Sequence, residues 1–135
     1  MIILDASAAT EIVRGTPQGR AFEMLMLDGE EVSASTLFHA EIRNVFWKYA
    51  RFYDMPEQEA TGHVMDAVAL VDEFCPMSEY GEEALLESLR WGHSVYDMFY
   101  LCAARRKGAT LLTADRKLMR LCQEAGVDCA CEVGL

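Results

Sequence analysis

The chain has 135 residues, of which 52% are hydrophobic, and a formal net charge of −10. This length predicts a single domain over residues 1–135, and this composition excludes an intrinsically disordered protein. No apolar run is long enough to span a bilayer, and residues 1–4 lead into Asp5 without a basic segment or cleavage site. We therefore expect a cytoplasmic protein without a membrane segment. The negative charge disfavours a broad, unspecific nucleic-acid binder and suits a basic protein partner.

The five cysteines are scattered along the second half of the chain. Their odd number and mostly apolar surroundings predict free thiols in a reducing compartment. Cys129 and Cys131 are close enough in sequence to share a metal. No second pair at ligand spacing accompanies them, which argues against a thiolate zinc site.

Hydrophobic periodicity and turn residues predict the elements of the first half of the chain. In order, we expect a strand over 2–4, a helix capped by Ser7 to about Arg14, a helix from Pro17 to Leu27, a turn over 28–30, a strand over 31–34, a helix capped by Ser35 or Thr36 to about Tyr53, and a helix from Pro56 to Phe74. The last two helices are expected to project together as an arm.

The second half continues the alternation. We expect a brief strand over 75–77, a helix from Glu79 to Trp91, a helix capped by Ser94 over 95–107, a strand over 109–113, a helix over 116–125 and a last strand over 126–130. Short apolar strands alternating with helices predict an α/β fold, with a central parallel sheet of about five strands flanked by helices.

Four acidic residues occupy positions where such a fold normally has neutral or apolar side chains. Asp5 and Asp115 follow predicted strands, Glu41 lies on the apolar face of a predicted helix, and Asp97 opens a nearly apolar helix. Ligands of open parallel sheets bind beyond the carboxyl ends of the strands, which places three of these acids at one edge. Asp97 joins them if its helix packs beside the first and fourth strands. A carboxylate-only pocket is suited to Mg²⁺ or Mn²⁺, and hence to metal-assisted hydrolysis of a phosphodiester.

Each acid also has a structural interpretation. Asp5 and Asp115 are placed to cap helices, and Asp97 stands three residues after Ser94, as in a capping box. Glu41 shares its face with apolar residues, and the alternative for it is a salt bridge to a core arginine.

Polar neighbours of these acids are candidate supporting residues. Ser7 and Thr113 lie within two residues of a strand-end acid, and they are equally suited to capping. Asn44 follows Glu41 by one helical turn and is placed either to orient that carboxylate or to face solvent. The three histidines share no spacing and are interpreted as surface or packing residues. Six cations are available for a basic rim around the pocket: Arg14, Arg43, Arg105, Arg106, Arg116 and Lys117.

Three stretches of the chain resemble the PIN-domain family, and within it the VapC-type toxins of toxin–antitoxin pairs. The first is Ile2-Ile3-Leu4-Asp5-Ala6-Ser7-Ala8, and the second is Ala40-Glu41-Ile42-Arg43-Asn44-Val45. The third combines Tyr96-Asp97, an apolar helix, and Gly108-Ala109-Thr110-Leu111-Leu112-Thr113-Ala114-Asp115, and it is the most specific. Together these stretches span nearly the whole chain.

This resemblance implies a PIN-like fold and a toxin with Mg²⁺- or Mn²⁺-dependent endoribonuclease activity. By position, Asp5, Glu41, Asp97 and Asp115 would be the metal-binding acidic quartet, and Thr113 and Asn44 would be supporting residues. It also implies an RNA substrate, a homodimer and a VapB-like antitoxin. The alternative is a PIN-like nucleic-acid-binding or RNA-processing module without a toxin role.

Overall fold

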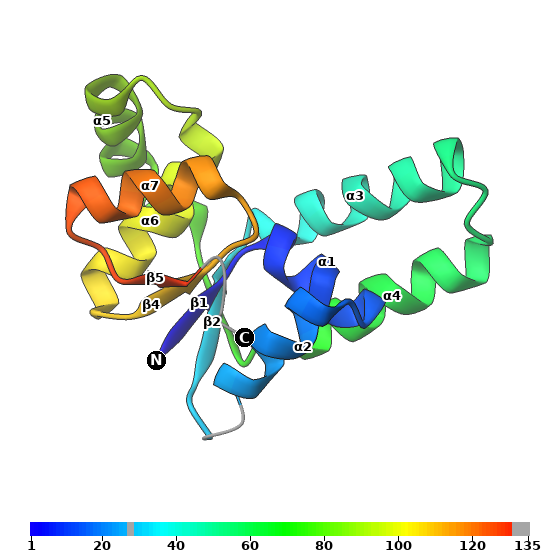
Figure 1. Ribbon diagram of the computed structural model, residues 1–135. Helices are drawn as coiled ribbons and strands as arrows, with labels where there is room; N and C mark the ends of the chain where they lie inside the picture. Colours follow the sequence, from blue (N-terminus) through cyan, green and yellow to red (C-terminus); the bar gives the residue numbers. More distant parts are fainter. Residues whose placement is uncertain (27–28, 131–135) are drawn as a thin grey trace.

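The strands form one parallel sheet, shown in the computed structural model of Figure 1, which describes residues 1–26 and 29–130. They are β1 (Ile2–Leu4), β2 (Val32–Ser35), β3 (Glu73–Cys75), β4 (Thr110–Leu112) and β5 (Cys129–Ala130). Their order is β3-β2-β1-β4-β5, and every neighbouring pair is parallel. The predicted α/β class and the five-stranded parallel sheet are confirmed.

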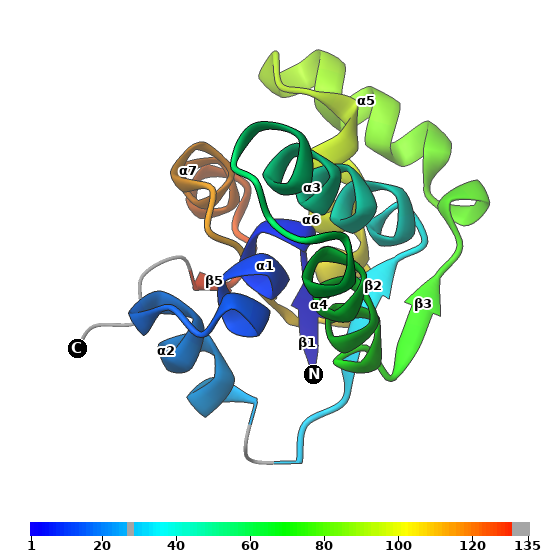
Figure 2. The same cartoon turned by 90° about the vertical axis from the view of Figure 1, so that its right-hand side faces the viewer.

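Helices cover both faces of this sheet (Figures 1 and 2). They are α1 (Ala6–Arg14), α2 (Pro17–Leu25), α3 (Phe38–Phe52), α4 (Glu57–Ala69), α5 (Gly81–Trp91), α6 (Val95–Lys107) and α7 (Arg116–Ala125). Successive strand residues point to opposite faces. Accordingly, Ile3 joins the core cluster of α5, α6 and α7, whereas Ile2 and Leu4 join that of α1 to α4. Within the described ranges, none of these helices is both long and apolar enough to cross a membrane.

Helix α6 is the central helix of its layer. Every residue from Met98 to Ala104 is buried, which explains why this helix lacks a polar stripe in sequence. It contacts β1, β2 and β4. Because α6 leads into β4 of a parallel sheet, it runs opposite to the strands, and its first turn lies at their carboxyl ends. This arrangement meets the condition under which Asp97 joins the other acids.

Helices α3 and α4 form the expected arm. Figure 1 shows them extending side by side beyond the sheet and joining at their far end, with α1 beside their base. Helices α1 and α2 approach so closely that a Cβ atom added at Gly19 would lie 1.9 Å from the Glu11 carbonyl oxygen. Helix α1 in turn contacts both arm helices, α3 and α4.

The boundaries after the arm differ from expectation. Helix α4 ends at Ala69 and not at Phe74, and the strand is 73–75 and not 75–77. The cause is pairing with β2: Asp72 donates its N–H to the Val32 carbonyl at 2.7 Å and accepts the Val32 N–H on its carboxylate at 2.9 Å. Residues 77–79 form a 3-10 turn instead of a strand.

Two predicted helix caps are also wrong. Asp5, and not Ser7, caps α1. At α3 neither Ser35 nor Thr36 caps the helix with its side chain, because the Thr36 hydroxyl accepts the Met77 N–H at 3.0 Å. The predicted ends at Leu27 and the turn residue Asp28 lie outside the described residues, as does Cys131. Four cysteines are free thiols: Cys75, Cys102, Cys122 and Cys129.

Candidate functional site

Asp5 lies directly after the central strand β1 and is 5% exposed. Its Oδ1 accepts the Ala8 N–H at 2.9 Å, which caps α1, and the Ser7 hydroxyl at 2.7 Å. The structural interpretation of Asp5 as a cap is therefore confirmed. Capping does not remove the charge from the sheet edge, and a carboxylate has more acceptor sites than these two donors fill.

The end of β4 is joined to the end of β1 through hydroxyl groups. The Ser7 Oγ accepts the Ala114 N–H at 2.9 Å and lies 3.3 Å from the Thr113 Oγ1. Thr113 in turn accepts the Asp115 N–H at 3.0 Å. Asp115 caps α7 by accepting the N–H of Lys117 at 2.9 Å. Ser7 and Thr113 thus fix the two strand-end acids relative to each other.

Glu41 reaches the same edge from the first turn of α3. Its Oε1 accepts the Tyr100 hydroxyl at 2.7 Å, across from α6. The alternative of a salt bridge to a core arginine is wrong, because the partner is this neutral phenol. Tyr100 was not identified from the sequence as a site residue. The sequence feature that indicates Tyr100 as a site residue is its position three residues after Asp97, on the same face of one helix.

Asp97 is fixed by a histidine that precedes its helix. The His93 Nε2 lies 2.7 Å from the Asp97 Oδ2, while Ser94 caps α6 by accepting the Tyr96 N–H. The interpretation of His93 as an ordinary surface or packing residue is wrong. Its four-residue spacing from Asp97 was visible, but His93 precedes the helix, so helical periodicity could not predict the contact.

Burial and mutual repulsion favour the neutral forms of Asp5, Glu41 and Asp97. Burial raises the pKa of Asp5 from 3.8 to about 6, despite hydrogen bonds from Ser7 and Thr113, and Asp97 raises it further. Burial likewise raises the pKa of Glu41 from 4.5 to about 7, with repulsion from Asp5 and Asp97 added. The pKa of Asp97 is raised by burial and by Asp115, against the opposing effect of His93. These pairwise repulsions connect all four acids in one electrostatic cluster.

The donor chemistry of this cluster fits a hard divalent cation, because the cluster offers carboxylate oxygens at a sheet edge. As they stand, no three Asp, Glu, His or Cys side chains among residues 1–26 and 29–130 are arranged to hold one ion. Glu41 and Asp97 each direct one oxygen toward a protein hydrogen bond, to Tyr100 and His93. Side-chain rotations would be needed to bring the carboxylates onto one ion.

The remaining candidates lie around this cluster or away from it. Asn44 is exposed on α3, and no hydrogen bond joins it to another described residue. Arg116 and Lys117 open α7 beside Asp115, and Arg43 lies on α3 near Glu41. Arg105 and Arg106 lie at the other end of α6, about 12 Å along the helix from Asp97.

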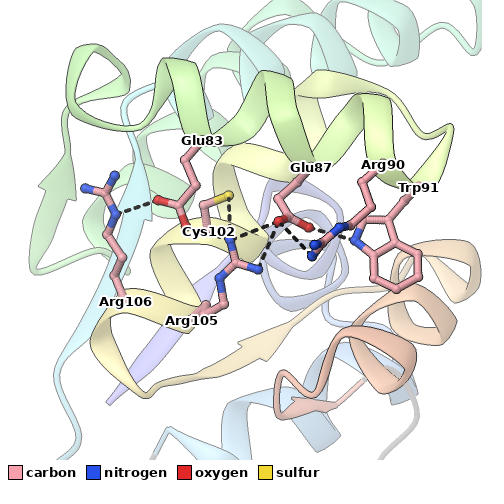
Figure 3. Close-up of polar contacts among 7 residues, drawn as sticks. All are labelled: Glu83, Glu87, Arg90, Trp91, Cys102, Arg105 and Arg106. Carbon is pink, nitrogen blue, oxygen red and sulfur yellow. Dashed lines mark hydrogen bonds and ion pairs between the residues drawn. The ribbon is translucent and has the colours of Figure 1, made fainter.

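Ion pairs account for these two distant arginines (Figure 3). Arg105 and Arg106 each donate to Glu83 at 2.6 Å, and Arg105 also pairs with the buried Glu87 at 3.3 Å. Their charges are neutralised between α5 and α6. They are therefore not part of a basic rim around the acidic cluster, contrary to the expectation from sequence.

Comparison with known proteins identifies the class of this fold and site. The family model for the PIN domain matches residues 2–124, so the chain belongs to the PIN domain family. Ribonuclease VapC12 of Mycobacterium tuberculosis is 31% identical over 118 residues, covering 87% of this chain and 89% of that protein. Ribonuclease VapC3 of Pyrobaculum aerophilum is 28% identical over 120 residues, covering 87% of this chain and 91% of that protein.

A solved structure supports the same fold. PAE2754 from Pyrobaculum aerophilum superposes with a TM-score of 0.70 at 24% identity, covering 88% of this chain and 77% of that chain. The PIN-like fold expected from the sequence resemblance is confirmed.

Proposed function

We propose that this PIN domain is a metal-dependent endoribonuclease of the VapC kind, acting as the toxin of a toxin–antitoxin pair. The observation that carries the proposal is the electrostatic cluster of four acids at the carboxyl edge of the sheet. The relatives named as VapC ribonucleases support the assignment of RNA as substrate. A VapB-like antitoxin and a homodimer are part of the same proposal.

In this proposal Asp5, Glu41, Asp97 and Asp115 hold one or two Mg²⁺ or Mn²⁺ ions. Such ions supply Lewis-acid activation of water and stabilise charge on the phosphate. The protein's task is to keep the four carboxylates in place and ionised beside the RNA. Tyr100 and His93 orient two of them through their 2.7 Å contacts, and Ser7 and Thr113 hold the two strand ends together. Asn44 is proposed as a further supporting residue.

Replacing Asp97 by asparagine tests the nuclease. Asp97→Asn removes a carboxylate ligand but keeps the side-chain shape, so we expect a loss of RNA cleavage of about 100-fold or more. Cleavage of labelled RNA with Mn²⁺, and its arrest by a chelator, is the measurement. Asp66→Asn, on the exposed face of α4, is the matched control and should cleave as the wild type does. A folded Asp97→Asn protein with full activity would overturn the assignment.

A further inference from the structure

A hollow lies beside the acidic cluster, between α1 and the arm helix α3. Its volume is about 490 Å³, and it is lined by Arg14, Val45, Lys48, Tyr49 and Tyr53. We propose that this hollow, the arm groove, binds single-stranded RNA and leads it toward the acidic cluster. The inference rests on the proposed ribonuclease function and adds the path that the substrate takes along the arm.

The arm groove joins cations to aromatic rings. The Arg14 guanidinium lies 4.6 Å from the centre of the Tyr49 ring and donates to the Tyr49 hydroxyl at 2.8 Å. The Tyr53 ring centre is 5.9 Å from that of Tyr49, and Tyr53 is 75% exposed. A fixed cation beside an open ring is the combination that binds a phosphate and stacks an unpaired base.

Charge separates this region from the rest of an acidic protein. Helix α3 carries Arg43, Lys48 and Arg51, and Glu41 is its only acid. Across the described ranges, no carboxylate lies within ion-pair distance of Arg14 or Lys48. By contrast, the cations of α5 and α6 in Figure 3 are paired with Glu83 and Glu87. A net charge of −10 thus coexists with a local basic surface suited to phosphates.

The arm groove is continuous with the cluster. Glu41, Val45, Lys48 and Tyr49 have the spacing i, i+4, i+7 and i+8, which places them on one face of α3. Val45 is about 6 Å, and Tyr53 about 18 Å, from Glu41 along the helix axis. An extended strand lying in the groove would therefore pass from Tyr53 toward the carboxylates.

A single strand fits this surface better than a duplex or an acidic peptide. In a duplex the faces of the bases are covered by their neighbours, so an exposed ring such as Tyr53 has nothing to stack on. An acidic peptide would use Arg14 and Lys48 but would gain no stacking from the tyrosines. Base stacking and phosphate contact together favour unpaired RNA.

Anisotropy of a labelled, unstructured RNA strand tests the arm groove, with chelator present to prevent cleavage. Tyr53→Ala should weaken binding about five- to 150-fold, the effect of one lost base stack. Lys48→Gln should reduce the salt dependence of log K by about 0.7, the effect of one lost phosphate contact. The matched controls are Met65→Ala, equally exposed on α4, and Lys107→Gln, at the opposite end of α6. Both should bind as the wild type does.

The outcomes separate the two proposals. If the wild type cleaves RNA but Tyr53→Ala and Lys48→Gln bind it normally, the arm groove is overturned and the nuclease stands. If the wild type binds RNA through these residues but never cleaves it, the nuclease fails and the groove stands. Equal binding of duplex RNA overturns the single-strand preference. Poly-glutamate serves as a second, non-nucleic-acid anion. If Lys48→Gln loses poly-glutamate binding while Tyr53→Ala has no effect on RNA binding, the groove is a simple anion site and the proposal is overturned.

Discussion

At the scale of the residue, the acidic cluster combines structural and chemical roles in the same side chains. Asp5 and Asp115 cap helices, and Glu41 links α3 to α6 through Tyr100. Burial is the largest cause of the raised pKa values of Asp5 and Glu41. A buried carboxylate that is ionised near another destabilises the metal-free fold. We therefore expect the carboxylates that would bind a cation to lower the stability of the metal-free protein.

This destabilisation predicts that Glu41→Gln changes the melting temperature in a pH-dependent way. Burial raises the pKa of folded Glu41 to about 7, from an ordinary value of 4.5. A raised pKa stabilises the fold while the group is protonated, fully below about 4.5, and this contribution is lost as pH rises through about 7. In chelator, Glu41→Gln should match the wild type near the lower pH. Above the higher pH it should melt higher by a few degrees.

Metal should reduce this difference in melting temperature. A cation at a hundred times its dissociation constant stabilises the wild type by about 2.7 kcal/mol, and Glu41→Gln should gain less. Glu57→Gln, which neutralises an exposed acid on α4, is the control and should behave as the wild type does in both media. Thermal melts across the pH range, with chelator and with Mg²⁺, are the measurement. Equal melting and equal response to Mg²⁺ would remove Glu41 from the cation site.

The four acids and the hydroxyl residues Ser7 and Thr113 could be predicted from the sequence, whereas the contacts of Tyr100 and His93 could not. Asp5 and Asp115 could be located because strand ends are visible in sequence, and Glu41 because an acid interrupts an apolar face. Tyr100 and His93 could not be assigned as partners, because a buried tyrosine and a loop histidine have the same local pattern whatever they contact. Their roles follow from how α6 packs against α3 and from the path of the chain before α6.

At the scale of the element, local signals predicted most helices and strands in their order along the chain, but not the order of the strands in the sheet. The error at the end of α4 has one cause, since a helical pattern continued through residues that instead pair with β2. Pairing partners far apart in sequence are invisible to periodicity. Likewise, the sequence could not show that α6 packs against β1, β2 and β4, because these contacts join residues far apart in the chain.

Helix α5 turns its acidic side toward the protein and its leucine side toward solvent. Its acidic side, with Glu83 and Glu87, contacts Arg105 on α6, as Figure 3 shows. Its opposite side exposes Leu85, Leu86 and Leu89, by 53%, 66% and 71%. Three exposed leucines on one turn-and-a-half of helix are typical of an interaction surface.

The stripe formed by Leu85, Leu86 and Leu89 has residues of opposite charge at its two ends. Glu82 precedes it and Arg90 follows it, and both are exposed on the face that Leu86 occupies. Arg90 also lies 3.6 Å from Glu87 of its own helix. In an antiparallel pair of α5 helices, Glu82 of each copy meets Arg90 of the other around a central Leu86. The stripe is therefore self-complementary, which supports the proposed homodimer with an isologous interface.

Leu86→Glu should dissociate this homodimer, because it places two carboxylates at the symmetry axis. Light scattering over a range of concentrations is the measurement. Met24→Glu, at an equally exposed site on α2, is the control and should leave the mass unchanged. Glu82→Arg should weaken the dimer, and adding Arg90→Glu should restore it. A wild-type monomer at all concentrations, or a dimeric Leu86→Glu protein, would contradict the interface.

At the scale of the whole molecule, charge is divided by region. Among the described residues, the cations of α1 and α3 have no acidic partner, whereas Arg90, Arg105 and Arg106 on α5 and α6 are paired with acids. The acidic cluster lies where α3 meets α6. The total of −10 could be counted from sequence, but this division depends on which helices pack together. This division is consistent with the two proposals, an RNA strand along the arm and a cation at the sheet edge.

The same division predicts how an antitoxin inhibits the proposed nuclease. A lysine or arginine of its C-terminal segment would enter the acidic cluster and replace the charge of the metal, through charge-assisted hydrogen bonds to the carboxylates. The segment should raise the melting temperature of the metal-free protein and compete with Mn²⁺ in a titration. The control is the same segment with every lysine and arginine changed to glutamine, which should lose both effects. Unchanged inhibition by that control segment would rule out charge replacement, and the antitoxin would then act by covering the arm groove or by another route.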